Sequence, residues 1–515
     1  MKTQWSSQQR RSAAVGALLL GFALAGCQGG AASEPEPSYW PTEGWQTTTP
    51  EAQGFHSAKL AEGLLAIQEN GTPVHSLMLI RDGYVLLDST FYPYDGSTVH
   101  DLASDTKSVM TTLIGIAADQ GLLDLDAPLV SFFPDRTIAN LDAQKESVTV
   151  RHLVSLTSGL KCDPQGDEQD LADMWASENW VQFALDRPSV AAPGKRFVYC
   201  GPDMHLLSAI VQQATGMTAL EFARQNLFES LGIHDVVWSA DPQGTTRGWG
   251  DLALYPADAA KLGLLFLQQG RWDDRQVVSR EWVAEATKAQ AQTGPYRSED
   301  YGYGWWVSRQ DEEVPYFSAS GRGGQYIRVF PGLNAIVATT GGGFDNAGDV
   351  TDYLGAAIGD MENPLPDNAA GVALLEAAEA AVSLPPAAKV VPPLPEAAKL
   401  ISGQTYVLES NPLQIESLRL NFDDGNQAIL DVQIGGEDEP RRITVGLDGV
   451  YRMSPGNEGL LQGARGGWTN PNTFVIDYNE VANIDDWTFQ AIFQGQDLLL
   501  LVFGPTSVKV EGSAK

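Results

Sequence analysis

Hydrophobic and polar positions predict a helix, a hairpin and a second helix in the first quarter of the chain. Residues 57–71 place apolar side chains three or four positions apart, which is the period of an amphipathic helix. Residues 76–92 place two β-rich apolar runs on either side of Asp82-Gly83, a strong signal for a tight hairpin turn. Residues 101–121 are apolar on most sides, so we expect a central, buried helix that Gly121 ends.

Similar patterns recur further along the chain. Helix-like and loop-like segments continue to about residue 290, and strand-like patterns return at 301–308 and 326–342. Two more helices are expected at 350–361 and 370–382. Early strands, a helical middle and late strands predict one domain whose sheet is completed by distant segments.

A proline-rich stretch at residues 384–399 is typical of a linker. Beyond it, strand-like runs alternate with Gly, Asn and Asp turns, which predicts a small antiparallel β-barrel or sandwich. The expected organisation is a signal peptide (1–27), a flexible tether (28–44), a main α+β domain (45–383), the linker and a β-rich C-terminal domain (400–515).

The composition limits the possible partners. The 515 residues carry a net charge of −32 at pH 7, and no basic run offers a local exception. Such a field repels nucleic acid and anionic lipid, so we expect no nucleic-acid partner. Oligomeric state leaves no signal in the sequence.

The N-terminus has the features of a targeting segment. Arg10 and Arg11 precede a short apolar run, 13–24, which is too short for a comfortable membrane span. The run ends in LAGC, which resembles a bacterial lipobox, and this implies that Cys27 is lipidated. The alternative is an ordinary secretory signal with a chance cysteine. By resemblance to lipoprotein sorting, Gln28 after the cysteine implies a lipid-anchored protein of the bacterial envelope, held at the outer membrane and facing the periplasm.

Two further cysteines, Cys162 and Cys200, remain in the exported chain. Disulfides persist outside the cytosol, so we expect these two cysteines to be bridged. The alternative is a pair of buried free thiols.

Ser104 and Lys107 form an S-x-x-K motif at the start of the apolar helix at 101–121. The spacing puts both side chains on one helix face, one turn apart. The serine N–H would lie at the positive end of the helix, and a buried lysine could help to deprotonate the serine. The alternative is an N-cap serine followed by a solvent-exposed lysine. A second copy, Ser158 to Lys161, is followed by no predicted helix and is interpreted as a turn.

Two later segments favour the functional interpretation of this motif over the structural one. Tyr199 precedes another apolar helix, and SASGRGG, from Ser318, leads into a strand. A serine–lysine helix, a tyrosine before a second helix and a glycine-rich strand together resemble the serine β-lactamase and penicillin-binding-protein superfamily. The class C β-lactamase-like group, with its esterases and the 6-aminohexanoate-dimer hydrolase, is the most similar branch. The segments that fit this branch are 153–160, 227–238, 252–272 and 301–306, and the resemblance covers roughly residues 50–360.

The resemblance implies a fold and a set of roles. The fold is an antiparallel sheet flanked by helices, together with an all-helical lobe. Ser104 would be the nucleophile, and Lys107 and Tyr199 would act as general base and acid. The backbone N–H groups of Ser104 and Gly321 would form the oxyanion hole. We also expect Ser318, Ser320 and Trp305 to contact the substrate.

Other aromatic residues are weaker candidates. Trp249 and Trp306 could join Trp305 in an apolar pocket, although packing alone explains all three tryptophans about as well.

Two positions depart from the family pattern. Gly201 stands where the Tyr-x-Asn motif has its asparagine, whose side chain normally bonds a substrate amide. Ser318-Ala319-Ser320 stands where relatives carry Lys-Thr-Gly or His-x-Gly, so a substrate carboxylate loses its expected cation. Arg322 could replace that cation, although a solvated arginine is the simpler interpretation.

Other chemistries find no support. The sequence contains no G-x-S-x-G elbow and no H-E-x-x-H, and we expect neither a metal nor a cofactor. The resulting hypothesis is a serine hydrolase that forms an acyl-enzyme with a small ester or amide. The alternatives are a DD-peptidase or class C-type β-lactamase, and a catalytically impaired binding protein.

Overall fold

The computed structural model describes residues 39–515, except 167, 296, 345, 423–424, 457–458 and 505–506. The predicted signal peptide, the proposed lipidation site Cys27 and most of the predicted tether lie outside the described residues. None of the helices in the described part of the chain is long and apolar enough to cross a membrane.

Seven antiparallel strands form the central sheet, in the order β2-β1-β12-β11-β10-β9-β8. Segments more than 200 residues apart pair in it, since β1 from the N-terminal part lies next to β12. The strands are β1 (Val74–Arg81), β2 (Tyr84–Thr90), β8 (Glu299–Tyr301), β9 (Trp306–Ser308), β10 (Phe317–Gly321), β11 (Gln325–Phe330) and β12 (Ala335–Gly341). The expected hairpin is β1–β2, and its turn residues Asp82 and Gly83 both have positive φ.

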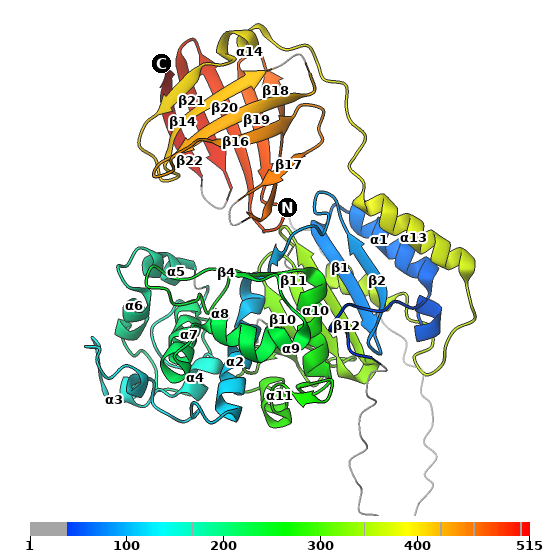
Figure 1. Ribbon diagram of the computed structural model, residues 1–515, viewed down its shortest axis with the longest axis vertical. Helices are drawn as coiled ribbons and strands as arrows, with labels where there is room; N and C mark the ends of the chain where they lie inside the picture. Colours follow the sequence, from blue (N-terminus) through cyan, green and yellow to red (C-terminus); the bar gives the residue numbers. More distant parts are fainter. Residues whose placement is uncertain are drawn as a thin grey trace, which may run out of the picture. The chain divides into compact units, whose positions relative to one another are not determined.

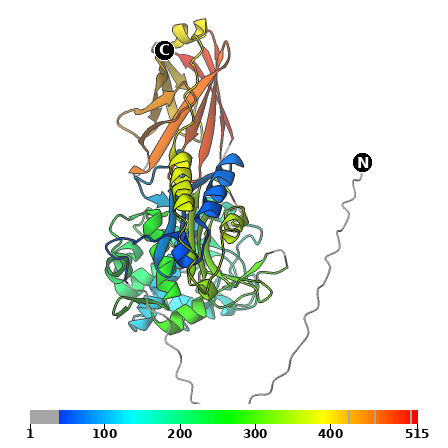
Figure 2. The ribbon, with the colours of Figure 1, turned by 90° about the vertical axis from the view of Figure 1, so that its right-hand side faces the viewer.

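Both faces of this sheet are buried. In β1, Met78 and Ile80 belong to the core shared with the helical lobe, whereas Leu77 and Leu79 face a second core. A strand covered on both faces reads as a continuous apolar run, which explains the sequence of β1. The second core is closed by α1 (Ser57–Glu69), α12 (Gly348–Gly355) and α13 (Ala369–Ser383), of which α1 and α13 lie side by side (Figures 1 and 2). The helix expected at 350–361 ends earlier, at Gly355.

The helical lobe surrounds the buried helix α2 (Thr106–Asp119), every residue of which is buried from Thr106 to Ala117. α2 packs on α7 (Gly201–Thr215), and α10 (Pro256–Leu267) packs on strands β11 and β12 of the sheet. The other helices of this region are α3 (Ala143–Glu146), α4 (Val150–Val154), α5 (Glu168–Trp175), α6 (Trp180–Asp186), α8 (Ala219–Ala223), α9 (Glu229–Leu231) and α11 (Arg280–Ala286). A small sheet combines β3 (His100–Asp101), which precedes α2, with β5 (Leu252–Leu254) and β4 (Val237–Trp238), and β6 (Arg271–Trp272) pairs with β7 (Arg275–Gln276).

The C-terminal strands form a closed β-barrel, drawn in yellow to red in Figure 1. Nine strands make the ring in the order β16-β15-β14-β13-β22-β21-β20-β19-β18, and the β16–β18 pairing closes it, with β17 added beside β18. The strands are β13 (Thr405–Leu408), β14 (Ile415–Phe422), β15 (Gln427–Ile434), β16 (Arg441–Gly446), β17 (Arg452–Pro455), β18 (Leu461–Asn470), β19 (Thr473–Asn479), β20 (Asp486–Gln494), β21 (Asp497–Phe503) and β22 (Val508–Ala514). Closure leaves no free strand edge in the ring, and alternate side chains fill its own apolar core.

The barrel decides between the two β-rich architectures that the sequence left open. A helix, α14 (Glu396–Ile401), begins inside the stretch expected to be linker and precedes the first barrel strand. The chain thus combines a β-lactamase-like α+β fold with a C-terminal β-barrel.

Candidate active site

Ser104 lies in a short 3-10 turn, Ala103–Asp105, between strand β3 and helix α2. Ala103 has a φ of +45°, a left-handed conformation that is costly for a residue with a side chain. Three bonds hold the turn: Ala103 N–H donates to the Asp101 carboxylate, Leu102 N–H donates to the Leu252 carbonyl, and the Thr106 hydroxyl donates to the Ala103 carbonyl. Strain held in place by several bonds is characteristic of functional sites.

Lys107 is the nearest functional group to the serine. Its Nζ donates to Ser104 Oγ at 2.9 Å and to the Trp249 carbonyl oxygen at 2.9 Å, and the residue is only 2% exposed. The expected alternative, a solvent-exposed lysine, therefore does not hold. A nucleophile and its base would need a hydrogen bond of this kind.

Tyr199 lies on the other side of the lysine. The Lys107 Nζ is 4.5 Å from the centroid of its ring, and Tyr199 is two residues before helix α7. The ring stacks on Trp306 at a centroid distance of 5.7 Å. Two segments far apart in the sequence, the start of α2 and the residues before α7, thus bring Ser104, Lys107 and Tyr199 together.

Gly321 is the last residue of strand β10 and lies against the turn that carries Ser104. A Cβ on Gly321 would stand 3.1 Å from Ser104 N and 2.6 Å from the Leu102 carbonyl oxygen. Only glycine permits so close an approach. The backbone N–H groups of Ser104 and Gly321 therefore belong to adjacent segments, as an oxyanion hole requires.

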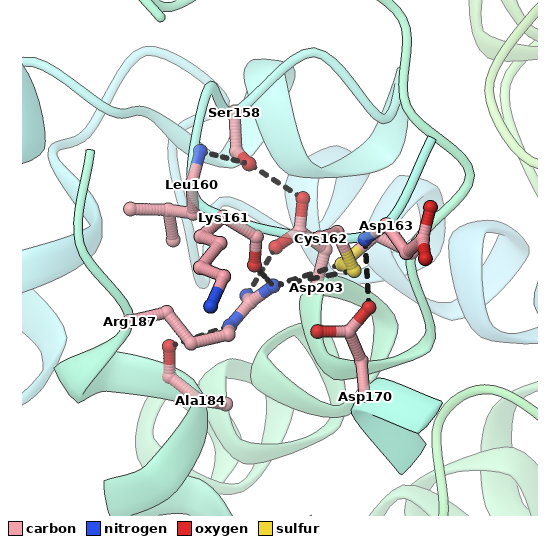
Figure 3. Close-up of a disulfide and its surroundings, with 10 residues drawn as sticks. Ser158, Leu160, Lys161, Cys162, Asp163, Asp170, Ala184, Arg187 and Asp203 are labelled. Carbon is pink, nitrogen blue, oxygen red and sulfur yellow. Dashed lines mark hydrogen bonds and ion pairs between the residues drawn. A yellow bond between two sulfur atoms is a disulfide. The ribbon is translucent and has the colours of Figure 1, made fainter. Parts of the chain in front are cut away.

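Cys162 and Cys200 are joined by a disulfide, with 5.9 Å between their Cα atoms. Cys200 follows Tyr199 directly and is the N-cap of α7. Figure 3 shows Arg187 beside this bridge: its guanidinium donates to Cys200 Sγ at 2.8 Å and pairs with Asp203 at 2.5 Å. Both charged side chains are at most 5% exposed. The bridge and the ion pair fix the start of α7 to the loop before α5.

The second S-x-x-K copy has a different environment. Ser158 Oγ donates to Asp203 at 2.6 Å and also accepts from Leu160 N–H (Figure 3). Ser158 is not part of a helix. Its hydroxyl serves the buried Arg187–Asp203 pair, so this copy of the motif is structural.

The expected site residues share a cavity of about 1040 Å³, with two exceptions. Ser104, Lys107, Tyr199, Ser320 and Gly321 all line it, as do Trp249 and Trp306.

Trp305 and Ser318 are buried and do not line this cavity, so their expected contact with the substrate stays a prediction. Trp306 is the first residue of β9 and lines the cavity, whereas Trp305, which precedes the strand, packs on Phe266 and Phe317. Ser318 is fully buried, and its hydroxyl is occupied by the Ala319 carbonyl and the Ser320 hydroxyl.

Carboxylates around the serine are the feature that the sequence interpretation missed. Burial and the nearby Asp251 raise the pKa of Asp101 to about 7. Asp105 is 1% exposed, and neither of its carboxylate oxygens has a hydrogen-bond partner among the described residues. Burial and the Asp101 charge raise its pKa well above the usual range, while the charge of Lys107 lowers it. The presence of two aspartates within three residues of Ser104 was the available signal.

The described part of the chain contains no candidate metal centre, because no group of three or more His, Cys, Asp or Glu side chains there could hold an ion.

The sequence profile of the Beta-lactamase family matches residues 58–357, more than half of the chain. The chain belongs to the Beta-lactamase family and is a serine hydrolase. The matched segment contains the central sheet, α2, α7 and the whole S-x-x-K, tyrosine and glycine constellation.

Known proteins of several kinds resemble this family member. Penicillin-binding protein 4 of Amycolatopsis lactamdurans is 24% identical over 51% of this chain and 77% of its own length. Esterase EstB of Burkholderia gladioli is 30% identical over 33% of this chain and 46% of its own length. Among solved structures, a proposed 6-aminohexanoate-dimer hydrolase from Bacillus anthracis has a TM-score of 0.51 at 15% identity, covering 61% of this chain and 85% of that one. The structural likeness shows the fold alone.

Proposed function

We propose that the protein hydrolyses a small ester or amide through an acyl-enzyme on Ser104. The observation that carries this proposal is the 2.9 Å bond from the buried Lys107 Nζ to Ser104 Oγ, at a cavity large enough for a small molecule. A buried serine–lysine pair beside a tyrosine has no evident structural purpose.

In the acylation step, Ser104 Oγ attacks the carbonyl carbon of the substrate and transfers its proton to the Lys107–Tyr199 pair. The carbonyl oxygen becomes an oxyanion that accepts from the N–H groups of Ser104 and Gly321. Collapse breaks the bond to the leaving group, which takes up the transferred proton. The product is an ester between Ser104 and the acyl group.

In the deacylation step, water gives a proton to the same pair and its oxygen attacks the acyl carbon. The bond to Ser104 Oγ then breaks, and the serine recovers a proton. The net reaction is hydrolysis, with the acid and the alcohol or amine as products.

A small ester or simple amide fits the departures from the family pattern. Gly201 cannot supply the side-chain amide that would bind a peptide or lactam, and Ser318 to Ser320 supply no cation. The similarity to an esterase supports this choice.

A DD-peptidase or β-lactamase activity is the second candidate, and the similarity to a penicillin-binding protein favours it. It would use the same nucleophile with a different set of substrate contacts. Lipid anchoring through Cys27 at the bacterial outer membrane is part of the same proposal, and it rests on the sequence of the N-terminal segment alone.

The test uses the chain from residue 28 and a fluorophosphonate probe, read by intact mass. A single adduct that Ser104→Ala abolishes would support an activated serine, and turnover of ester, amide and lactam panels would then separate the two candidates. A folded wild-type protein without an adduct would refute the proposal in favour of a binding protein.

A further inference from the structure

A loop of the C-terminal barrel, residues 480–485 between β19 and β20, reaches the turn that carries the nucleophile. The Ala482 carbonyl oxygen accepts from Asp101 N–H at 2.8 Å. Val481 and Ala482 are fully buried, in a small core with Tyr94 of the β-lactamase-like domain. The loop is thus fixed three residues from Ser104.

The same loop covers the segment that follows the oxyanion-hole glycine. A Cβ on Gly323 would stand 2.3 Å from Ile484 Cγ2, so the Ile484 side chain packs directly on the backbone of Gly323. Asp485, the next residue, lines the same cavity as Ser104. The barrel therefore supplies a part of the wall of the candidate active site.

The carboxylate of Asp485 lies close to one particular cation, the guanidinium of Arg322. Its Oδ1 is 3.9 Å from the nearest guanidinium nitrogen of Arg322, which follows Gly321 directly. Arg322 is the residue that could have replaced the cation missing from Ser318-Ala319-Ser320. With Asp485 in place, that guanidinium is offset by a carboxylate before any substrate arrives.

The lining of the whole cavity likewise contains more carboxylates than cations. Among the described residues, seven carboxylates and four cations line it. Besides Arg322, the cation Arg328 also has a carboxylate partner in the lining, Glu299 at 3.6 Å. An excess of carboxylates in a cleft repels anions and attracts cations.

We propose that Asp485 is a specificity-determining residue, through which the C-terminal barrel disfavours substrates with a carboxylate near the scissile bond and favours neutral or cationic ones. The inference rests on the proposed function, because it concerns substrates of Ser104. It gives the barrel a role in the chemistry of a domain that begins hundreds of residues earlier in the chain.

The experiment compares two aryl alkylphosphonate probes that differ only in a terminal carboxylate. Each forms a covalent adduct with an activated serine, and the rate of adduct formation is followed by intact mass, with Ser104→Ala as the blank. Asp485→Asn keeps the shape of the side chain and removes its charge. We expect it to raise the carboxylate-to-neutral rate ratio by about tenfold at low salt, and by less at high salt.

Two further variants sharpen the result. Arg322→Gln, at a side chain that is 64% exposed, should shift the ratio in the opposite direction without endangering the fold. Asp477→Asn, a carboxylate of β19 that pairs with Arg465 outside the cavity lining, should leave the ratio unchanged.

The outcomes separate this inference from the function on which it rests. If Ser104 reacts but the ratio is the same in wild type, Asp485→Asn and Arg322→Gln, charge selection by Asp485 is refuted and the hydrolase proposal stands. If neither probe labels the folded wild type, both proposals fail together.

Discussion

Lys107 Nζ donates a hydrogen bond of 2.9 Å to Ser104 Oγ, from a position where the lysine is almost completely buried. The lysine reaches this position because α2 places it one turn after the serine, in the core between the helical lobe and the sheet. Its second acceptor, the Trp249 carbonyl, comes from a segment 142 residues away. The pair is therefore held by tertiary structure, and its chemistry is open to direct tests.

Loss of the lysine should cost rate and leave binding of the substrate largely unchanged. In the proposed reaction Lys107 takes the proton of Ser104, so we expect Lys107→Ala to lower kcat for a neutral aryl ester by about 10²–10⁴-fold. The matched control is Lys161→Ala, in the second S-x-x-K copy, where the side chain is exposed. A loss of similar size in both variants would contradict the assignment.

A side chain at the oxyanion-hole glycine should also reduce the rate. The Cβ of Gly321→Ala would crowd the Leu102 carbonyl at 2.6 Å and push β10 away from Ser104 N. We expect kcat to fall by roughly 10²–10³-fold, the usual effect of losing one such donor. Gly332→Ala is the control, because a Cβ there has no neighbour within 4 Å and should leave kcat unchanged. Equal rates for Gly321→Ala and wild type would exclude this oxyanion hole.

Removal of the disulfide should lower stability. Cys162→Ser/Cys200→Ser frees the start of α7 from the loop before α5, and we expect a loss of about 2–4 kcal/mol in the free energy of unfolding. Urea unfolding followed by circular dichroism measures it. A reducing agent should shift the wild type by a similar amount and leave the double variant where it is; equal unfolding midpoints for all samples would show that the bridge contributes nothing.

Much of the local structure could be predicted from the sequence because it is encoded locally. Asp82-Gly83 supplies the two positive φ values that the β1–β2 turn needs. The largely apolar segment from Val109 to Ala117 predicts a helix that is buried on all sides, as α2 is. The Ser104–Lys107 spacing follows from helix geometry alone. The resemblance then added Tyr199 and Gly321, which no local pattern would have connected to the serine.

The remaining features depend on contacts between distant segments, which leave no periodic signal. Both Trp305 and Trp306 are buried, so the sequence did not indicate which one faces the cavity. Closure of the barrel depends on pairing between β16 and β18, and the approach of Asp485 to Arg322 spans 163 positions. Neither is visible in the composition of either segment.

The carboxyl group of Asp101 should make stability depend on pH. Burial and the charge of Asp251 raise its pKa to about 7, whereas an aspartate in the unfolded chain has lost its proton by about pH 5. Between about pH 4 and 7 the folded protein thus holds a proton that the unfolded chain has released, so this group's contribution to stability is lost as the pH rises through 7. Asp101→Asn keeps the acceptor for Ala103 N–H and removes the titration. We expect the free energy of unfolding of the variant to increase relative to that of the wild type as the pH rises from 5 to 8. Urea unfolding at each pH measures it.

The pKa of Asp448 is shifted in the opposite direction, so stability should depend on pH with the opposite sign at this residue. The hydrogen bond from Arg452 lowers the pKa of Asp448, so its contribution is present above the usual aspartate range and is lost as the pH falls. Asp448→Asn should therefore lose stability relative to wild type at pH 7 and recover part of it near pH 3. If the two variants differ from wild type by amounts that do not change with pH, these carboxyl groups do not have the shifted pKa values that their surroundings imply. If only Asp101→Asn shows no pH dependence relative to wild type, Asp101 does not have the raised pKa that its burial implies.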